Sequence, residues 1–453
     1  MMKQKLQLLF TVAITIFFGT KTFSQDWETV GNPGFSAGFV EDVSLDFNAN
    51  GEPYVAYRDG GNMLKATVMK FDGTNWNPVG SEGFSPGQVS FTSLAIDNSG
   101  TPIIAYSDSA ETSKATVMKF DGTNWVVVGS AGFSADTAYH TKLAIGNNNE
   151  LFVAYQDWAE DFGVTVMKFN GSTWETVGDS GFSGSGSINT DPSLAINSNG
   201  EPFVAFRDSA NGNRMTVMKF DGSDWILVGN AGFSSGNIIN PSLAFNNNNE
   251  PYVAYTDGGN GDKASVMKFD GSNWVAVGNA GFTTDEAIST SLAFSDTGAP
   301  CVAFRDGANS NKVTTMIFDG TNWQAIGTEG FSEGSSGYIS LAFDNSGKPT
   351  VAFLDGANDS GATVMKYTGT LATQEVEALS LTIYPNPAED YINLEWGLDV
   401  QPQSFSIIDI LGNIILKTSK VKQSINIENL RAGMYVLVIN SENNISYKKF
   451  LKK

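Results

Sequence analysis

Short apolar segments alternate with polar turns from residue 25 to residue 370, and the alternation repeats about every 49 residues. Each repeat holds four segments, which read W-x-x-V-G, S-L-A-F, V-A-Y-x-D and V-M-K-F, with Gly, Asn, Asp or Pro between them. β-Branched and aromatic residues bounded by such turn formers are typical of β-strands. No long stretch has apolar residues at the helical period, so the pattern predicts an all-β fold with almost no helix.

One tryptophan, at the start of the W-x-x-V-G segment, marks each repeat. Successive tryptophans are 49 residues apart, except for 51 residues between the fourth and the fifth: Trp27, Trp76, Trp125, Trp174, Trp225, Trp274 and Trp323. Seven four-stranded antiparallel units of this length favour a seven-bladed β-propeller over residues 25–370. A solenoid is the alternative, but a solenoid needs distinct capping units, and the two ends of this repeat region differ in another way.

The two ends of the repeat region complement each other. The first W-x-x-V-G segment, residues 27–31, precedes every other segment, whereas the last V-M-K-Y segment has no tryptophan after it. Pairing residues 27–31 antiparallel with residues 362–367 would complete the last blade and leave no exposed sheet edge. We therefore predict a ring that the N-terminal strand closes.

The order of the segments also predicts two different faces. With S-L-A-F as the innermost strand, both tight hairpins of each unit lie on one face of the propeller. The opposite face gathers the turn after V-A-Y-x-D and the longer loop that contains G-F-S. Binding residues are usually carried on such loops, and the single two-residue insertion falls in one of them, between Phe182 and Leu194.

The segments outside the repeats predict an exported protein with a second domain. Lys3 and Lys5 precede an apolar run that ends near Gly19, and residues 1–24 therefore have the features of a signal peptide. No other segment approaches the roughly 20 apolar residues that a membrane span needs, so we expect no transmembrane segment in the mature chain. Residues 371–378 are expected to form an acidic linker to a domain at 379–453.

The order of motifs in this last domain is distinctive. It contains Y-P-N-P at residues 384–387, D-x-x-G at 409–412, a G-x-Y-x-hydrophobic segment from residue 433 and a lysine-rich end. This order resembles the type A sorting domain of type IX secretion substrates in Bacteroidota. The resemblance implies a small Ig-like β-sandwich that engages the type IX secretion machinery. It also implies a secreted or outer-surface location, after signal-peptide export to the periplasm.

The net charge argues against nucleic acid binding, and the cysteine count excludes a disulfide bond within the chain. The formal net charge is −21, and such a surface repels nucleic acid phosphates, so no nucleic acid partner is expected. The only cysteine, Cys301, excludes an internal disulfide. It occupies the position of Tyr54 and Tyr252 in other repeats, which favours a buried apolar role.

One aspartate ends every V-A-Y-x-D segment. We name these seven residues the aspartate ring: Asp59, Asp108, Asp157, Asp208, Asp257, Asp306 and Asp355. A ring of carboxylates could hold a divalent cation such as calcium, or bind sugar hydroxyls. Each aspartate precedes a turn, however, where Asp commonly accepts hydrogen bonds from its own backbone, and this structural role is the favoured interpretation. No other cofactor is expected.

A more informative position lies three residues before the innermost-strand leucine. We name its residues the mouth ring, because the propeller geometry places them around the mouth of the central channel: Asp42, Phe91, His140, Asp191, Asn240, Ser289 and Tyr338. Acid, amide, hydroxyl, imidazole and aromatic groups occupy one position of an otherwise uniform repeat. Neutral drift at an exposed rim explains this variety, and so does an asymmetric ligand site.

The phenylalanines of G-F-S recur in all seven repeats. They are expected to pack between blades, and stacking platforms for sugars are the alternative.

These residues predict a binding protein more readily than an enzyme. His140 is the only histidine, which excludes a repeated histidine-based site or a histidine metal cluster, and no catalytic residue can be assigned. The favoured function is a non-catalytic surface module that binds an extracellular glycan or a surface protein, as in adhesion. A polysaccharide hydrolase or lyase with one site at the channel mouth is the alternative, but strong repetition supplies few distinct groups in one place.

Overall fold

The computed structural model describes residues 26–185, 191–369, 382–395, 402–409, 414–418, 423–441 and 445–453. The chain divides into two compact units, Met1–Gly369 and Thr370–Lys453. The predicted signal peptide at 1–24 and linker at 371–378 lie outside the described residues.

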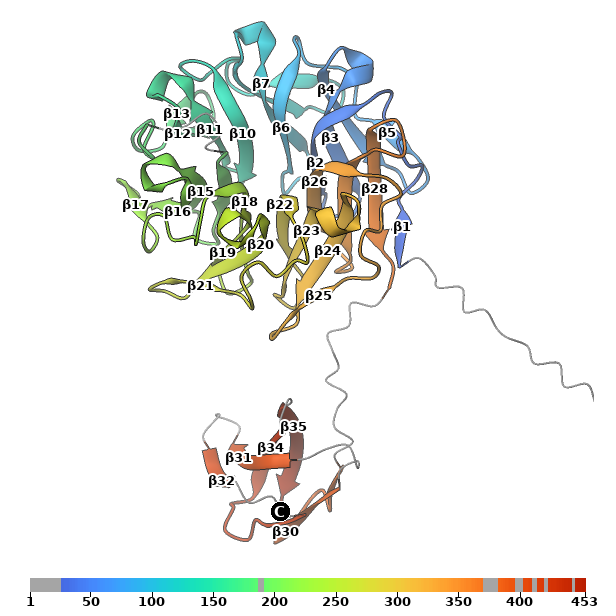
Figure 1. Cartoon of the computed structure of the whole chain (residues 1–453), viewed down its shortest axis with the longest axis vertical. Helices are drawn as coiled ribbons and strands as arrows, with labels where there is room; N and C mark the ends of the chain where they lie inside the picture. Colours follow the sequence, from blue (N-terminus) through green and yellow to red (C-terminus); the bar gives the residue numbers. More distant parts are fainter. Residues whose placement is uncertain are drawn as a thin grey trace, which may run out of the picture. The chain divides into compact units, whose positions relative to one another are not determined.

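The first unit contains seven four-stranded antiparallel sheets, each built from four consecutive segments of the repeat except the last (Figure 1). Blade 1 comprises β2 (Val40–Phe47), β3 (Pro53–Asp59), β4 (Lys65–Phe71) and β5 (Trp76–Pro78). Blade 2 comprises β6 (Val89–Ile96), β7 (Pro102–Asp108), β8 (Lys114–Phe120) and β9 (Trp125–Val127). Blade 3 comprises β10 (Ala138–Ile145), β11 (Leu151–Asp157), β12 (Gly163–Phe169) and β13 (Trp174–Thr176).

The remaining blades follow the same order. Blade 4 comprises β14 (Ser193–Ile196), β15 (Pro202–Asp208), β16 (Arg214–Phe220) and β17 (Trp225–Leu227). Blade 5 comprises β18 (Ile238–Phe245), β19 (Pro251–Asp257), β20 (Lys263–Phe269) and β21 (Trp274–Ala276). Blade 6 comprises β22 (Ala287–Phe294), β23 (Pro300–Asp306), β24 (Lys312–Phe318) and β25 (Trp323–Ala325). Blade 7 comprises β26 (Ser336–Phe343), β27 (Pro349–Asp355), β28 (Gly361–Tyr367) and β1 (Trp27–Thr29).

The predicted ring closure is confirmed. Strand β1 pairs antiparallel with β28, with Trp27 opposite Tyr367 and Thr29 opposite Met365, and β1 lies beside β28 in Figure 1. The amide of Val30 also donates to the carbonyl of Val364. The N-terminal strand therefore covers the edge that the last blade would otherwise expose.

The contacts between blades repeat as regularly as the strands. Each repeat tryptophan donates its indole N–H to a carbonyl of the neighbouring blade, as Trp76 does to Val30 at 2.7 Å. Each also stacks on a phenylalanine of G-F-S, with ring centroids 4.0 to 4.6 Å apart: Phe331, Phe35, Phe84, Phe133, Phe182, Phe233 and Phe282. These phenylalanines therefore pack between blades, which is the interpretation that the sequence favoured.

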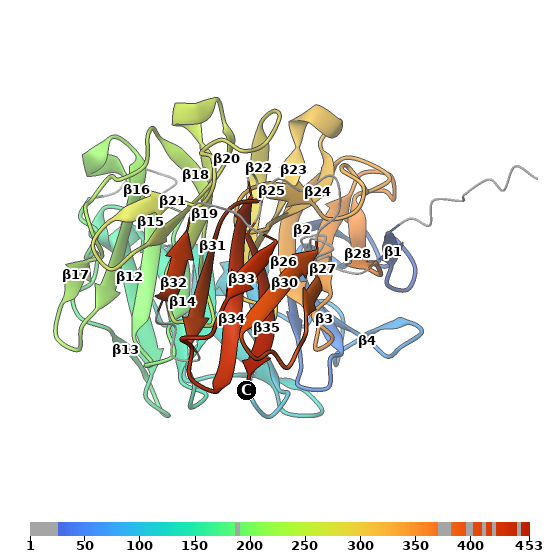
Figure 2. The ribbon, with the colours of Figure 1, turned by 90° about the horizontal axis from the view of Figure 1, so that it is seen from below.

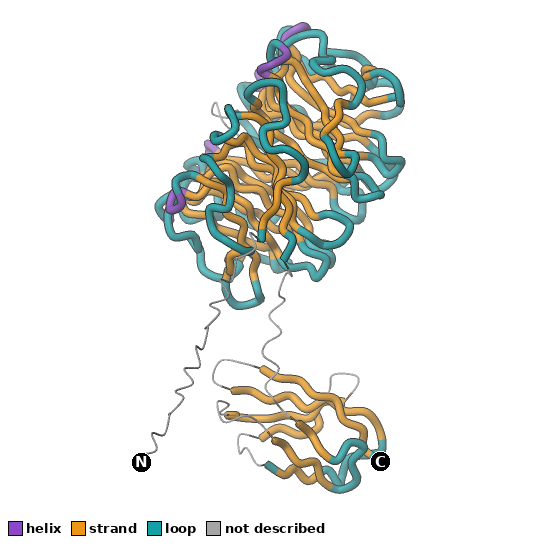
Figure 3. The backbone as a smooth tube through the Cα atoms, turned by 90° about the vertical axis from the view of Figure 1, so that its right-hand side faces the viewer, coloured by secondary structure: helices purple, strands orange, loops and turns teal. Residues whose placement is uncertain are grey.

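The two faces differ as predicted. Six 3-10 helices, η1 to η6, follow the second strands of blades 1 to 6, and no α-helix occurs among the described residues. Their bounds are Gly60–Asn62, Ser109–Glu111, Trp158–Glu160, Ser209–Asn211, Gly258–Asn260 and Gly307–Asn309. Figures 2 and 3 show these helices along one face of the propeller, away from the tight hairpins.

The described residues of the second unit form a β-sandwich of seven strands. One sheet has the order β29 (Thr382–Tyr384), β30 (Tyr391–Glu395) and β33 (Ser424–Asn426), and the other has the order β32 (Ile414–Thr418), β31 (Pro402–Asp409), β34 (Gly433–Ser441) and β35 (Ile445–Lys452). Both sheets contribute to one buried core, which includes Ile392, Leu437 and Phe450. This agrees with the predicted small sandwich.

Candidate functional site

The mouth ring shares one backbone conformation. All seven residues have a positive φ, between 42° and 57°, which is the left-handed region. In six blades the residue lies at a register shift in the innermost strand, such as the shift between Ser90 and Ser93 in β6. This irregularity is a β-bulge, which bends a strand and redirects a side chain. The fold therefore presents one side chain per blade in the same way.

Only some of the side chains at these bulges are those that a left-handed backbone prefers. Asn and Asp tolerate a left-handed conformation, so Asn240, Asp42 and Asp191 suit it. A bulky residue there costs roughly 1 kcal/mol, because its Cβ approaches the following carbonyl oxygen. Phe91 nevertheless occupies the position, which is the behaviour expected where side-chain chemistry outweighs local backbone preference.

Three neighbouring members of the ring contact one another. The ring centroids of Phe91 and His140 are 4.5 Å apart, with the planes tilted by 37°. The Nδ1 atom of His140 is 3.4 Å from Oδ1 of Asp191. On the other side, Oδ2 of Asp42 accepts a hydrogen bond from the amide of Phe91. Blades 1 to 4 thus form a continuous arc of carboxylate, phenyl, imidazole and carboxylate groups.

The imidazole in this arc is kept neutral. Burial lowers the pKa of His140 below its ordinary 6.5, and the Lys142 ammonium lowers it further, although the Asp191 carboxylate acts in the opposite direction. Burial likewise raises the pKa of Asp42 above 3.8, against the effects of the Phe91 amide and Lys142. Near neutral pH, His140 can therefore accept a hydrogen bond or a proton.

Lys142 is a residue of the site that the sequence analysis missed. The equivalent position is serine in the other six blades, and each of those hydroxyls accepts a hydrogen bond from the leucine amide of the next blade's innermost strand, at 2.9 to 3.0 Å: Ser44, Ser93, Ser193, Ser242, Ser291 and Ser340. Lys142 has no side-chain oxygen and cannot bond to Leu194 in this way. The sequence signal that could have identified Lys142 is that it replaces a serine present in all the other repeats.

These serines and Lys142 line a cavity of about 330 Å³ in the central channel. They follow the mouth ring by two residues along the innermost strands, so the cavity lies directly below it. The volume is within the range of small-molecule sites. Lys142 is the only charged residue in its lining.

The other members of the mouth ring lie apart from this arc. Oδ1 of Asn240 accepts a hydrogen bond of 3.1 Å from the amide of Ser289. Tyr338 is 41% exposed. Burial raises its pKa, as do the carboxylates of Glu41 and Asp42, while Arg58 lowers it. The structure therefore joins Asp42, Phe91, His140 and Asp191 by direct contacts, and it places the remaining three around them.

The carboxylates of the aspartate ring accept hydrogen bonds from the turns that follow them. Oδ1 of Asp59 accepts from the amide of Gly61, and Oδ2 accepts from the hydroxyl of Thr67 and the side-chain amide of Asn62. All seven carboxylates cap the turn that follows them. No group of three or more His, Cys, Asp or Glu side chains suited to a metal ion occurs in the part of the chain that the structure describes.

Two blades modify this cap. Glu111 and Glu160 replace the asparagine that donates to the ring aspartate in the other five blades. Burial raises the pKa of Asp108 and Asp157, and the adjacent glutamates raise it further. Both aspartates still cap their turns.

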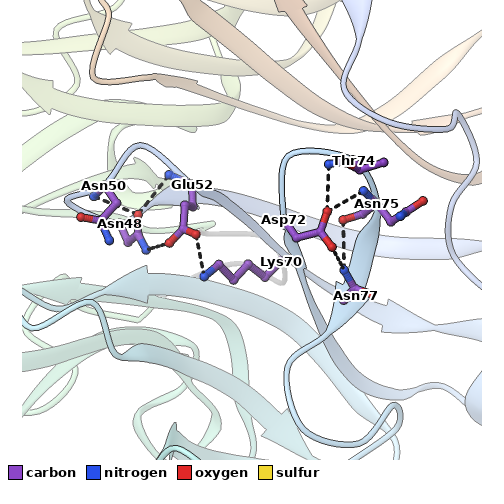
Figure 4. A network of polar contacts seen from close by, with 8 residues as sticks. All are labelled: Asn48, Asn50, Glu52, Lys70, Asp72, Thr74, Asn75 and Asn77. Atoms are coloured by element: carbon purple, nitrogen blue, oxygen red, sulfur yellow. Dashed lines mark hydrogen bonds and ion pairs between the residues drawn. The ribbon is translucent and has the colours of Figure 1, made fainter.

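A larger depression lies on the tight-hairpin face between blades 1 and 2. Its volume is about 790 Å³, and Tyr54, Lys70, Asp72 and Asn77 are in its lining. Figure 4 shows that three of these polar groups already have partners: Lys70 pairs with Glu52 at 2.8 Å, and Oδ2 of Asp72 accepts from Asn77 at 2.8 Å. We favour the channel site, because the mouth ring above its cavity combines chemically different side chains that contact one another.

Cys301 is buried, as expected, and burial raises the pKa of its thiol well above the ordinary value. A thiol in such a site is not reactive.

The sandwich can be identified by sequence comparison. Residues 382–453 match the family described as the secretion system C-terminal sorting domain. The second unit is a type IX secretion sorting domain. The chain is therefore exported by type IX secretion to the cell surface or the medium. Among the described residues, no helix has the length and apolar character needed to cross a membrane.

Solved structures resemble the chain only distantly. One is PorZ of Porphyromonas gingivalis, an essential surface component of the type IX secretion system. It is 15% identical at a TM-score of 0.46, and the match covers 93% of this chain and 60% of PorZ. This chain thus spans about 60% of the length of PorZ.

Two carbohydrate-active enzymes are similarly distant. A polysaccharide lyase that acts on ulvan is 12% identical, with a TM-score of 0.45, over 74% of this chain and 94% of the lyase. The α-L-arabinofuranosidase Arb93A of Fusarium graminearum is 14% identical, with a TM-score of 0.42, over 62% of this chain and 92% of the enzyme. No curated protein sequence matches the chain. Likeness at this level carries nothing about ligand or activity.

Proposed function

We propose that the propeller is a non-catalytic carbohydrate-binding module, which the sorting domain delivers to the cell surface or the medium. The ligand site is the arc of the mouth ring formed by Asp42, Phe91, His140 and Asp191, together with the cavity below the ring. The observation that carries the proposal is the row formed by Phe91, His140 and Asp191, with contacts of 4.5 and 3.4 Å.

This row combines the two kinds of group that sugar recognition needs. An aromatic ring offers a flat apolar surface to the C–H groups of a sugar, while carboxylate and imidazole groups bond to its hydroxyls. His140 and Asp191 would form a small number of directed hydrogen bonds with the sugar. The uniform bulges support the proposal, because a rigid backbone that holds different side chains in one orientation preorganises a site.

A double variant tests this function. Phe91→Asn with Asp191→Asn removes the ring and one carboxylate, and asparagine suits the left-handed backbone at both positions, so we expect the variant to fold. The full-length mature chain is applied to an array of neutral and acidic polysaccharides. We expect the wild type to bind at least one glycan and the double variant to lose at least tenfold in affinity.

Ser289→Ala is the matched control, because Ser289 belongs to the same ring but lies outside the contacting arc. It should bind as the wild type does. Unchanged binding by the double variant, or absence of binding by the wild type, would overturn the proposal.

A polysaccharide-cleaving enzyme is the second candidate, and the contact between His140 and Asp191 favours it. A neutral imidazole oriented by a carboxylate can act as a general base. Release of reducing ends or unsaturated sugars by the wild type, lost in His140→Asn while binding is retained, would establish the enzyme. Binding without product release supports the module.

A further inference from the structure

Blade 3 carries an aromatic extension of the mouth that the proposed function does not use. Trp158 opens η3 and is 49% exposed. The equivalent residue is glycine or serine in the other six blades: Gly60, Ser109, Ser209, Gly258, Gly307 and Gly356. Those blades form the same turn after the ring aspartate, so the turn does not require a tryptophan.

Three side chains of blade 3 form this extension, and we name Tyr139, Trp158 and Phe162 the aromatic strip. The rings of Trp158 and Phe162 are 4.8 Å apart at 74°, and the ring of Tyr139 is 6.2 Å from each of them. The edge-to-face contact with Phe162 fixes the indole in place, with half of its surface in water.

The strip is continuous with the mouth ring. Tyr139 immediately precedes His140 in β10, and its ring centroid is 6.3 Å from that of Phe91. Phe91 in turn lies 4.5 Å from His140. Aromatic surface therefore extends without a break from the exposed rim of blade 3 to the arc that contains Asp191.

The charges beside the strip are negative. Glu160 and Asp161 belong to the same turn as Trp158, and Asp136 lies in the loop before β10; all three are exposed. Charges of one sign within about 8 Å repel an anionic ligand at physiological salt. Uronate or sulfate groups would therefore be disfavoured at this rim.

We propose that the aromatic strip is a second sugar subsite and that the ligand is a neutral oligosaccharide or polysaccharide. One sugar unit contacts the mouth ring, and a following unit stacks on Trp158 outside the channel. This inference rests on the proposed carbohydrate binding and adds to it the class of glycan and a requirement for chain length.

The test compares ligand length with the loss of the strip. Trp158→Ser introduces the residue that blades 2 and 4 already have, so the turn should be retained. The probes are glucan, xylan, mannan and galactan fragments of one to six sugar units, with galacturonan fragments as the acidic counterpart, and affinity is measured by calorimetry on the full-length mature chain.

We expect the wild-type affinity for neutral fragments to rise roughly tenfold from one unit to several, as one stacking contact supplies. Trp158→Ser should bind the single sugar unchanged and lose this rise. Galacturonan should bind at least tenfold more weakly than the neutral fragments at low salt. Met63→Ser is the control: Met63 is an exposed apolar residue of the corresponding turn in blade 1, and Ser310 already occupies that position in blade 6.

The possible failures are distinguishable. If Trp158→Ser keeps the full dependence on chain length while Phe91→Asn loses binding, the strip is not a subsite and the proposed function stands. A preference for galacturonan would overturn the glycan class. If the wild type binds none of these fragments, both proposals fail.

Discussion

The aspartate ring and the mouth ring each contribute one residue per blade, but they repeat different things. The aspartate ring repeats a side chain together with its partners, so that Asp59 and Asp306 make the same bonds in blades 1 and 6. The mouth ring repeats only a backbone conformation, and its side chains range from Ser289 to Phe91. Repetition of a bonded group therefore indicates structure, whereas variety on a fixed backbone indicates a candidate binding surface.

The largest effect should come from removing a repeated structural element. Deleting residues 26–31 uncovers the edge of β28 and removes Trp27, which is 1% exposed. Loss of a buried tryptophan alone costs about 3–5 kcal/mol, so we expect the propeller to unfold at 25 °C or to lose most of its free energy of unfolding. Urea denaturation followed by circular dichroism measures this. Glu28→Ser, on the exposed side of β1, should change little, and a stable deletion variant would contradict ring closure.

A smaller effect should separate the two rings directly. Asp306→Ala removes a cap and its bonds to Thr314 and Asn309, and should lower the free energy of unfolding by about 2–3 kcal/mol. Ser289→Ala in the same blade should change it by less than about 0.5 kcal/mol, because no described residue bonds to that hydroxyl. Equal losses in the two variants would remove the distinction between the rings.

Asp46 gives a test that depends on pH. The equivalent residue in the other six blades is alanine, and burial raises the pKa of Asp46 from 3.8 to about 6, although its carboxylate accepts from the amide of Ile96. Because the folded-state pKa exceeds the unfolded one, the wild type loses stability as pH rises from about 4 to about 6. The free energy of unfolding of Asp46→Asn, relative to that of the wild type, should therefore rise by about 2–3 kcal/mol between about pH 4 and pH 6. Above about pH 6 the difference between the two proteins should be constant. A difference that does not vary with pH would contradict the raised pKa.

The smallest effect concerns the electrostatics of the mouth. His140 is the only histidine, so its Hε1 resonance can be followed by NMR without ambiguity. Lys142→Ser removes a neighbouring cation and should raise the pKa of His140, whereas Asp191→Asn should lower it. The same Lys142→Ser variant restores the hydroxyl that bonds to the next blade, and should add roughly 1 kcal/mol of stability. If the pKa of His140 shifts in neither variant, then neither Lys142 nor Asp191 interacts electrostatically with the imidazole.

The architecture could be predicted from the sequence because the seven repeats can be aligned with one another. The unpaired Trp27 segment predicted the closing strand, and the turn after Asp59 predicted the caps. The left-handed bulge at Asp42 and Phe91 could not be predicted, since no glycine marks it and the register between the two strands of a blade cannot be read from the repeat. The ring contact of Phe91 with His140 depends on that bulge.

Two residues of the candidate and proposed sites could have been found from the same internal alignment. Lys142 replaces an otherwise invariant internal serine, and Trp158 replaces glycine or serine. Each is a single exception at a position that otherwise holds only serine or glycine, which is a weaker signal than the variety of the mouth ring. The sorting domain was identified from ordered motifs, which do not depend on the propeller at all.

The central claim, that ligand occupies the mouth ring, is tested most directly by the His140 resonance in the presence of glycan. Saturating the full-length chain with a neutral oligosaccharide that it binds should shift the Hε1 signal and change the pH at which it titrates, because the sugar contacts the imidazole or displaces water from it. An unchanged signal and titration in the saturated complex would place the ligand elsewhere and contradict the account.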